Sequence, residues 1–446
     1  MTNYPTKYLL FLLIFHSIFF GFGIRQSRAC HPTDSEALLD FKRRITSDPS
    51  VLLGSWIPSK DCCTSWDGIK CDPSTGRVIN LDRPGLYSDS SGDRIDTSMS
   101  GTLSPFLGNL SSLQLLNLAS LQNLTGPIPS EIGKLTNLRK MYLGSNSLEG
   151  SIPSSIEGMS RLQILTLNQN HLMGPIPHNL FKKLTSLTYV DFSRNNLTGS
   201  VPESIGNLSN LGFLFLQNNR LSGSIPPSIG NMKSLQLIYL SNNDLSGPIP
   251  NSIGNLRLAH TLNLENNTLS GNIPTSIRNM TSLVNILLAN NNFTGKIPLT
   301  LSRLEQLSHL DLSRNRLSGP IPPQLAKLRN LGNLFLSRNG LSGQIPPQLA
   351  KLRSLGYLVL SRNRLSGPIP PQLANLSSLG FLDLSGNSLT GKIPEGILNL
   401  EYLVQFNVSW NQLSGKIPLH RFDFPASGFA GNPGLCGAPL APCNNY

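Results

Sequence analysis

A repeat of 24 residues, with the pattern LxxLxLxxNxLSGxIPxxIGNLxx, fills most of this chain and limits what it can fold into. The spacing between the repeated asparagines is 24 throughout, except for one step of 25 that contains the extra residue of the segment 181–183. The asparagines are Asn146, Asn170, Asn195, Asn219, Asn243, Asn267, Asn291, Asn315, Asn339, Asn363, Asn387 and Asn411. Such a period predicts a solenoid, in which each unit packs on its neighbours and no single central core forms.

Each unit predicts a short strand, a turn and an irregular return. In LxLxx the leucines point inward and the residues between them point outward. The asparagine that follows is expected to be buried at the turn, where its amide bonds backbone groups of its own and the neighbouring coil. Gly and Pro in SGxIP favour a turn and a short extended piece over a helix. The IGNL segment is then expected to form about one irregular or 3₁₀ turn.

Stacking of these units predicts an α/β fold, a right-handed solenoid with a curved parallel β-sheet on its concave side and short 3₁₀ or helical turns on its convex side. A less regular unit with Leu113, Leu116 and Leu118 precedes the regular repeats, and an opening strand is expected at 78–81. At about 4.8 Å per strand, thirteen or fourteen strands would form an arc of roughly 60 Å. A surface of this size suits a protein or a polymer better than a small molecule.

Residues 1–29 are predicted to be a signal peptide that is cleaved before Cys30. Lys7 precedes an almost wholly apolar run at 8–23, and the small residues Ser27 and Ala29 precede the cut. The run is shorter than the ~20 residues that a spanning helix needs, although an uncleaved membrane anchor is the alternative. No second apolar run of that length occurs, so we expect no membrane span after removal of the signal peptide.

All six cysteines lie near the two ends of the chain. An even number of cysteines, grouped in this way in an exported chain, predicts disulfide-locked caps. Cys62 and Cys63 are adjacent and are not expected to bond to each other. The expected pairs are Cys30–Cys62, Cys63–Cys71 and Cys436–Cys443. A zinc site is the alternative, although the sequence contains no CxxC pair.

The N-terminal cap is expected over 30–77, the solenoid over 78–419 and the C-terminal cap over 420–446. A capping box at 33–36 predicts the start of a helix in the first cap. This helix is expected to bury Ala37, Leu38, Phe41 and Ile45. The polar, turn-rich segment 84–99 is expected to be a surface loop inserted before the regular repeats.

The segments CHPTDSEALLDFKRRITSDPSVLLGSW and DCCTSWDGIKCDPSTGRVINL, together with the LSGxIP repeats, resemble plant extracellular leucine-rich-repeat proteins. LQNLTGPIP and the four-cysteine cap are similar to the polygalacturonase inhibitors of that family, which are shorter. FAGNPGLCGAPLAPC is similar to the end of a receptor-like protein or a receptor-kinase ectodomain, but unlike in those proteins no transmembrane helix is expected after it. The resemblance implies a leucine-rich-repeat fold and a secreted protein of the apoplast or cell wall.

Residues that flank the inward leucines are expected to face the concave surface, where exposed aromatic side chains are unusual. They fall into two groups, around Phe215 and around Tyr357. Two interpretations stay open: the rings stiffen the sheet by packing together, or they anchor a partner. The predicted partner-binding residues are Tyr142, Tyr189, Asp191, Phe213, Phe215, Tyr239, His309, Asp311, Phe335, Tyr357, Phe381 and Asp383.

The residue before the repeated asparagine forms another column, which contains Arg194, Arg314, Arg338 and Arg362. The formal net charge is +12, and the first 29 residues supply three of these charges and no acid, which leaves +9 for the rest. The column therefore predicts a basic edge for a carboxylate-rich pectic polymer or an acidic peptide. A solvated edge is the alternative. Residues 311–384 consist of nearly identical units, so tandem duplication accounts for part of this column.

Nine Asn-x-Ser/Thr sequons predict N-glycosylation in a secreted chain. They are Asn109, Asn123, Asn196, Asn207, Asn266, Asn279, Asn292, Asn375 and Asn407. A glycan on Asn407 is expected to block binding on the concave face near it.

The sequence contains no HExxH, GxSxG, GxxxxGK[ST] or GxGxxG motif, and its seven histidines are scattered. We therefore expect a binding protein that is not an enzyme and needs no cofactor or metal. The predicted signal peptide and the sequons oppose nucleic-acid binding. The prediction is a secreted recognition protein that binds an extracellular protein or peptide, such as a receptor-kinase ectodomain, in plant defence or developmental signalling. Alternatives are an inhibitor of a microbial polygalacturonase and a structural cell-wall glycoprotein.

Overall fold

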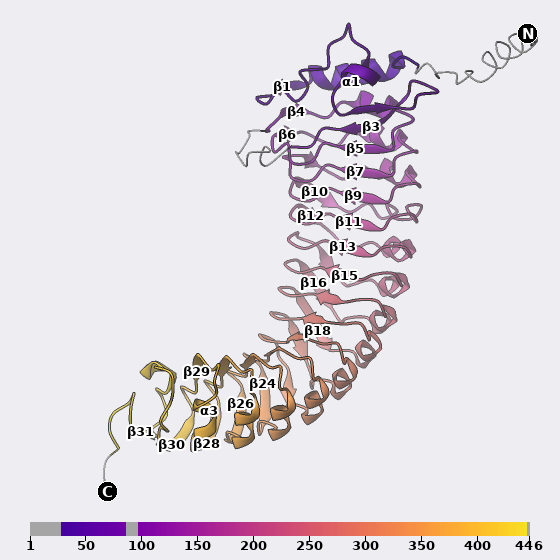
Figure 1. Ribbon diagram of the computed structural model, residues 1–446. Helices are drawn as coiled ribbons and strands as arrows, with labels where there is room; N and C mark the ends of the chain where they lie inside the picture. Colours follow the sequence, from indigo (N-terminus) through magenta and orange to yellow (C-terminus); the bar gives the residue numbers. More distant parts are fainter. Residues whose placement is uncertain (1–27, 86–96, 444–446) are drawn as a thin grey trace, which may run out of the picture.

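The computed structural model describes residues 28–85 and 97–443. The predicted signal peptide lies almost wholly outside the described residues, and so does most of the predicted loop at 84–99. The described chain forms one curved stack of repeats between an N-terminal and a C-terminal cap (Figure 1). No helix within the two described ranges is long and apolar enough to cross a membrane.

A 15-stranded sheet runs along the whole stack. All neighbouring strands in it are parallel except β2 and β3, which pair antiparallel. Its strands are β2 (Ile69–Cys71), β3 (Val78–Asp82), β5 (Leu115–Asn117), β7 (Lys140–Tyr142), β9 (Ile164–Thr166), β11 (Tyr189–Asp191), β13 (Phe213–Phe215), β15 (Leu237–Tyr239), β17 (Thr261–Asn263), β19 (Asn285–Leu287), β21 (His309–Asp311), β23 (Asn333–Phe335), β25 (Tyr357–Val359), β27 (Phe381–Asp383) and β29 (Gln405–Asn407). From β5 onward, the central residue of each strand in this sheet is buried, and its two neighbours are exposed or half-buried in every case except β17.

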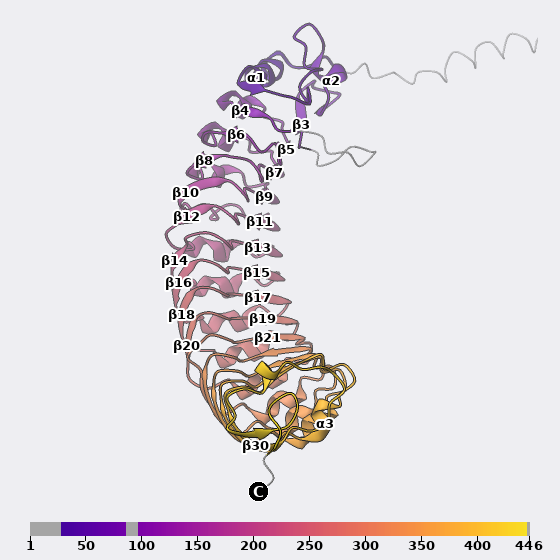
Figure 2. The same cartoon turned by 90° about the vertical axis from the view of Figure 1, so that its left-hand side faces the viewer.

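The extended piece after each asparagine pairs with its neighbours and forms additional sheets, a pairing that the sequence did not reveal. These strands lie along a different side of the stack from the 15-stranded sheet (Figures 1 and 2). They are β1 (Ile45–Ser47), β4 (Ser100–Thr102), β6 (Leu124–Thr125), β8 (Glu149–Gly150), β10 (His171–Pro175), β12 (Asn196–Thr198), β14 (Ser222–Gly223), β16 (Asp244–Gly247), β18 (Thr268–Asn272), β20 (Asn292–Thr294), β22 (Ser318–Gly319), β24 (Gly340–Gly343), β26 (Arg364–Pro368), β28 (Ser388–Gly391), β30 (Gln412–Lys416) and β31 (Gly434–Cys436).

Short 3₁₀ helices cover the outer side of the bend in Figure 1, and from η2 onward each of them starts directly after a proline. They are η1 (Pro105–Asn109), η2 (Ser130–Lys134), η3 (Ser154–Gly158), η4 (Glu203–Asn207), η5 (Pro227–Asn231), η6 (Asn251–Asn255), η7 (Thr275–Asn279), η8 (Leu299–Arg303), η9 (Pro323–Lys327), η10 (Pro347–Lys351), η11 (Pro371–Asn375) and η12 (Ala426–Gly428). The α-helices are α1 (Pro32–Arg43), α2 (Cys62–Ser65) and α3 (Glu395–Leu398). The expected leucine-rich-repeat solenoid, with its long parallel sheet and 3₁₀ turns, is therefore confirmed.

The repeated asparagine joins consecutive turns as expected. Asn243 is buried, and its Nδ2 donates to the carbonyl oxygens of Leu216 and Leu240 at 3.0 and 3.2 Å. Its Oδ1 accepts from the backbone N–H of Leu221 at 3.0 Å. The same set of bonds recurs from Asn170 onward, so the asparagines satisfy buried backbone groups on both sides of each turn.

The spacing between the 3₁₀ helices depends on the fourth residue of each helix. This residue is glycine in η4, η5 and η6, and a Cβ on Gly254 would lie only 2.4 Å from the carbonyl oxygen of Ser276 in η7. The equivalent residues of η7 to η11 are Arg278, Ser302, Ala326, Ala350 and Ala374. Side chains at these positions require wider spacing on the outer side, which agrees with the stronger bend in the orange part of Figure 1.

The first cap differs from the expectation in how its helix begins. Helix α1 starts at Pro32, and the side chain of His31 caps it by accepting from the N–H of Thr33, so the predicted capping box at 33–36 is wrong. Pro32 favours this earlier start because its fixed φ suits the first helical position. Asp34 instead turns inward, where it pairs with Arg77 at 2.7 Å and accepts from the N–H of Val78.

The remainder of the cap packs around α1. Ala37, Leu38 and Phe41 are buried as expected, whereas Ile45 lies beyond the helix, in β1, and is half-buried. The rings of Trp56 and Trp66 stack with their centroids 5.5 Å apart. This aromatic pair closes the first end of the solenoid.

Three disulfides hold the two caps, between Cys30 and Cys62, Cys63 and Cys71, and Cys436 and Cys443. These are the pairs that the sequence suggested. The sulfur atoms of Cys30, Cys62 and Cys63 lie within 4.8 Å of one another. All three are in disulfides, so they do not offer the thiolates that a zinc site requires.

Candidate functional site

The concave face of the 15-stranded sheet carries the predicted partner-binding residues. All twelve lie on its strands, at positions next to a buried central residue. Because the register is the same from strand to strand, side chains from different repeats line up across the face. Eight of them form two aromatic clusters, whereas the three aspartates and Tyr142, on β7, lie outside both.

The first aromatic cluster consists of Tyr189, Phe213, Phe215 and Tyr239, on the adjacent strands β11, β13 and β15. The ring of Phe215 lies 5.5 Å from Tyr189 and 5.4 Å from Tyr239, and the ring of Tyr189 lies 5.8 Å from Phe213. All four side chains are only half-buried. Burial raises the pKa of the Tyr189 hydroxyl, with a smaller contribution from the charge of Asp191. The cluster combines an apolar surface with the hydroxyl group of Tyr189, which the raised pKa keeps neutral at physiological pH.

The second aromatic cluster consists of His309, Phe335, Tyr357 and Phe381, on β21 to β27. Centroid distances along this row are 5.3, 6.3 and 5.8 Å. Tyr357 is 50% exposed, more than an aromatic ring that serves only packing requires. The rings thus contact one another and still offer area to a partner, so stiffening of the sheet and anchoring of a partner are compatible here.

A polar stretch separates the two clusters, on β17 and β19 and the residues beside them. Asn285 donates to the hydroxyl of Thr261 at 3.0 Å. Glu265 follows β17 and is half-buried; burial raises the pKa of its carboxyl, and the nearby charge of Asp311 adds to this effect. Sequence reasoning missed Glu265, although it is the only acid among the residues that lie two positions before the repeated asparagines, most of which are serines. At about 4.8 Å per strand the polar stretch separates the clusters by roughly 15 Å.

The predicted aspartates have structural partners of their own. Asp191 and Asp383 each accept from the backbone N–H and the hydroxyl of the serine two residues later. Asp311 accepts from the N–H of Ser313 at 2.8 Å. Burial raises the pKa of Asp191, while the bonds from Ser193 partly offset this effect. These carboxylates therefore fix the turn after the strand and have limited capacity left for a partner.

The four arginines of the predicted basic edge all have a left-handed backbone. The φ angles of Arg194, Arg314, Arg338 and Arg362 lie between 52° and 55°, and their side chains are exposed. The same position is occupied by Asn218, Asn242, Asn266 and Asn290 in the middle of the stack. Asparagine tolerates this conformation, whereas it is uncommon for arginine. Backbone preference therefore does not account for arginine at this edge.

Trp410 occupies the same left-handed position at the C-terminal end of the edge and is 71% exposed. Sequence reasoning missed it because the column was searched for charge. Between Trp410 and Arg362 lies Gly386, which has no side chain to cover either neighbour. The edge thus ends in a large exposed ring.

The predicted glycosylation sites lie on several sides of the stack. Asn407 is half-buried on β29, and its Oδ1 accepts from Ser409, which leaves its Nδ2 for attachment of a sugar. Asn266 donates to Asn242 and accepts from Asn290, both at 2.8 Å, in a row along the left-handed edge. A glycan on Asn266 would interrupt this row. Asn207, Asn279 and Asn375 are exposed at the ends of 3₁₀ helices.

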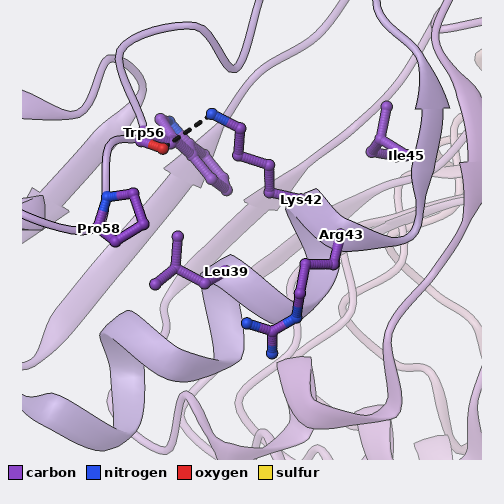
Figure 3. Close-up of a pocket in the computed structure, with 6 residues that line it drawn as sticks. All are labelled: Leu39, Lys42, Arg43, Ile45, Trp56 and Pro58. Atoms are coloured by element: carbon purple, nitrogen blue, oxygen red, sulfur yellow. Dashed lines mark hydrogen bonds between the residues drawn. The ribbon is translucent and has the colours of Figure 1, made fainter.

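A pocket of about 350 Å³ lies on the N-terminal cap, between α1 and the segment around Trp56 (Figure 3). Its polar group is already engaged, because the ammonium group of Lys42 donates to the carbonyl oxygens of Leu53 and Trp56 at 2.8 Å. Arg43 at the rim pairs with Glu36 at 2.6 Å. Lys42 thus links α1 to the segment 53–56, and both cations already have partners, so the pocket is a weaker candidate than the sheet.

Comparison with known families agrees with this architecture. A leucine rich repeat N-terminal domain model matches residues 31–72. Leucine rich repeat models match 175–221 and seven further segments: 137–159, 234–256, 260–280, 306–328, 330–352, 354–376 and 378–400. The cap and the repeats are thus recognised separately.

Individual relatives include a leucine-rich repeat protein, FLOR 1, of Arabidopsis thaliana, which is 39% identical over 32% of this chain and 39% of its own length. A polygalacturonase inhibitor of Vitis vinifera is 34% identical over 26% of this chain and 31% of its own length. The chain therefore spans well under half of these relatives. Among solved structures, the PEPR1–AtPEP1 complex superposes with a TM-score of 0.80 at 35% identity, over 88% of this chain and 56% of that chain.

Proposed function

Since this chain belongs to the plant leucine-rich-repeat proteins, we propose that it is a recognition protein that binds an extracellular peptide or protein segment on its concave face. The observation that carries this proposal is the pair of half-exposed aromatic clusters around Phe215 and Tyr357, each spread over at least three strands. Aromatic side chains of this kind dominate the binding energy of protein interfaces. Binding needs no cofactor and no catalytic group.

The arrangement favours an extended ligand that follows the stack. The two clusters lie roughly 15 Å apart across the strands, a distance that about five residues of an extended peptide cover. Two apolar side chains at this separation would contact both clusters, while a polar segment between them faces Thr261, Asn285 and Glu265. The likeness to a receptor solved with a peptide, PEPR1 with AtPEP1, supports a peptide as the ligand class.

We place the protein outside the cell, in the apoplast or cell wall. Its three disulfides persist in oxidising compartments and are uncommon in the cytosol. The predicted signal peptide and the sequons lead to the same location. A role in defence or developmental signalling follows if the bound peptide is a signal, and a receptor-kinase ectodomain is then the natural downstream partner.

Direct binding tests this proposal. The purified protein is titrated with a library of plant extracellular peptides, in parallel with a variant that carries Phe215→Ala and Tyr357→Ala. We expect at least one peptide to bind the parent protein and to lose about tenfold or more in affinity with the variant. Peptides that bind both proteins equally, with no peptide sensitive to the substitutions, would exclude the concave clusters as the site.

Inhibition of a microbial polygalacturonase is the second candidate, and the similarity to the Vitis vinifera inhibitor favours it. The release of reducing ends from pectate is measured for a panel of fungal and insect enzymes, with and without the protein. Inhibition that depends on dose and is lost in the Phe215→Ala variant would establish the inhibitor function. Unchanged rates for every enzyme would exclude it for that panel and favour the peptide ligand.

A further inference from the structure

A groove of about 1560 Å³ runs along the helical side of the solenoid, over η8 to η11 in the orange part of Figure 1. Its lining comes from the 3₁₀ helices and the segments that follow them, and includes Lys327, Arg329, Lys351 and Arg353. No lining residue belongs to the 15-stranded sheet, so the groove is separate from the aromatic clusters.

The groove exists because the helices separate in this part of the stack. From η4 to η6, glycine as the fourth helical residue lets each helix contact the backbone of the next; a Cβ on Gly230 would lie 2.4 Å from the carbonyl oxygen of Ser252. Ala326, Ala350 and Ala374 occupy this position in η9 to η11 and line the groove. Their methyl groups do not fit the close spacing of the glycine helices, so the later helices lie further apart.

Hydrogen bonds between the helices end at the same place. The hydroxyls of Ser228 and Ser252 donate to carbonyl oxygens of the preceding helix at 2.8 and 2.6 Å. The hydroxyls of Ser276 and Thr300, in η7 and η8, are buried without a partner in the structure. The glycines at the fourth helical position thus end at η6, and the hydroxyl bonds to the preceding helix end at η7, so both changes occur just before the groove begins.

The walls of the groove are strongly basic. Lys327 and Lys351 end consecutive helices, and Arg329 and Arg353 follow two residues later, so each turn contributes one pair of cations. Glu305 is the only acid in the lining. Within the described part of the chain, none of these four cations forms an ion pair. Four exposed positive charges against one negative charge favour an anionic occupant.

The apolar part of the lining, here called the floor, narrows the choice of occupant. Ala326, Ala350 and Ala374 are half-buried, and Pro347 lies beside them. A polyuronate chain carries carboxylates but no aliphatic side chains to bury on this floor. A polypeptide segment with acidic residues on one side and small aliphatic residues on the other satisfies both the walls and the floor.

We propose that the part of this groove over η8 to η10, away from the predicted glycosylation site Asn375 at the end of η11, is a second docking site, which binds an acidic, amphipathic segment of a partner protein. Its aliphatic side chains lie against Ala326 and Ala350, and its carboxylates face Arg329 and Arg353. The concave face remains free for a different ligand, so one molecule of this protein can hold two partners at once.

The test uses the full secreted protein and a fluorescent helical peptide of about sixteen residues, long enough to cover about 24 Å. The peptide has glutamate on one face and alanine and leucine on the other. A second peptide replaces every glutamate with glutamine, and an oligogalacturonate serves as the polyuronate probe. Affinity is measured by fluorescence anisotropy at low and at physiological ionic strength.

The matched pair of variants is R329E/R353E in the groove and K233E/R257E as control. Lys233 and Arg257 are exposed and occupy the equivalent position after η5 and η6, where glycine keeps the helices close together. We expect the acidic peptide to bind the parent, to weaken with salt, and to lose about tenfold or more in affinity only with R329E/R353E. Filling the floor with A326Q/A350Q should weaken it as well.

Any one of four results would overturn the proposal. The acidic peptide does not bind, the two charge-reversal variants behave alike, or the glutamine peptide binds as well as the acidic one. Binding of the oligogalacturonate that depends on Arg329 and Arg353 but not on the alanines would also overturn it, because the groove would then be a polyuronate site.

Discussion

The ring of Phe215 lies 5.4 Å from the ring of Tyr239 on the next strand and 5.5 Å from that of Tyr189 on the preceding one. Phe215 therefore joins the first aromatic cluster. In Phe215→Ala we expect ligand affinity to fall by about tenfold or more, because the centre of an apolar anchor is removed. The free energy of unfolding should fall by only about 1 kcal/mol, since the ring is half exposed. Calorimetric titration and urea unfolding measure the two effects.

Phe192 provides the contrasting control. It is fully buried beneath the sheet and stacks on Phe181 at 6.3 Å. Phe192→Ala should cost about 3–5 kcal/mol of stability and leave the affinity of the remaining folded protein unchanged. If Phe215→Ala were the more destabilising of the two variants, the cluster would be a structural element and not a binding site.

Arg338 has a φ of 54° and should be less stable at its position than asparagine. We expect Arg338→Asn to raise the free energy of unfolding by about 0.5–1 kcal/mol, because asparagine adopts this conformation at lower cost. The same variant should weaken binding of any acidic ligand that uses the edge. Denaturant melts and titration against that ligand give the two values. Greater stability with unchanged affinity for every ligand would leave the arginine column without a binding role.

Asn243 is bonded to four backbone groups in two consecutive turns. Asn243→Ala should cost about 1–3 kcal/mol, because those buried groups lose their partner. Exposed Asn231, at the end of η5, serves as the control, and its replacement by alanine should change stability by less than about 0.5 kcal/mol. Equal losses in the two variants would contradict the role of the asparagine bonds in joining the turns.

Gly254→Ala tests whether glycine sets the spacing of the 3₁₀ helices. The added Cβ would lie 2.4 Å from the carbonyl oxygen of Ser276, so we expect a loss of about 1–3 kcal/mol. The comparison is Gly332→Ala, where the nearest atom to an added Cβ lies 3.7 Å away. That variant should be nearly neutral in thermal unfolding. A neutral Gly254→Ala would show that the helices can separate without cost.

We expect His309 to make the free energy of unfolding depend on pH. Burial lowers the pKa of its imidazole, and the charge of Asp311 opposes this only in part. The unfolded chain therefore takes up the proton at a higher pH than the folded chain, so this residue favours unfolding as the pH falls below about 6.5. His309→Asn should lose less stability than the parent between about pH 7.5 and about pH 5. The exposed His178→Asn variant is the control. If the stability of His309→Asn depended on pH in the same way as that of the parent and of this control, the assignment would be wrong.

The period alone was enough to predict the solenoid. Twelve repeats place leucine and asparagine at the same positions of every unit, and stacking the units on one another is the one arrangement that buries both kinds of side chain. The bonds of Asn243 followed from the same reasoning, since a buried amide must find backbone partners. The helix start at His31 was missed because the Thr-x-x-Glu pattern competes with Pro32, and fixed geometry at Pro32 prevails. The second set of strands was missed because its pairing joins SGxIP segments of different repeats and leaves no alternating pattern within one.

The candidate site was less predictable than the fold. Tyr189 and Phe215 could be assigned to one face because strand alternation is strict, but only coordinates give their contact distances. The left-handed backbone conformation of Arg338 could not be predicted from the sequence, because arginine does not indicate this conformation as glycine or asparagine does. The groove depends on Ala350 in place of glycine. The effect of this one methyl group could not be predicted without the position of the helix in the next repeat.

Hydrogen bonding between adjacent turns, of the kind that Asn243 makes, affects how such a protein can evolve. Each turn contacts only the turns beside it, so a whole repeat can be inserted or deleted without disturbing distant ones. The nearly identical units at 311–384 are consistent with such an event. Every insertion between Tyr239 and His309 would lengthen the gap between the aromatic clusters by one strand, about 4.8 Å. The number of repeats between the two clusters therefore sets the length of ligand that contacts both. This length changes in steps of one strand while the fold stays the same.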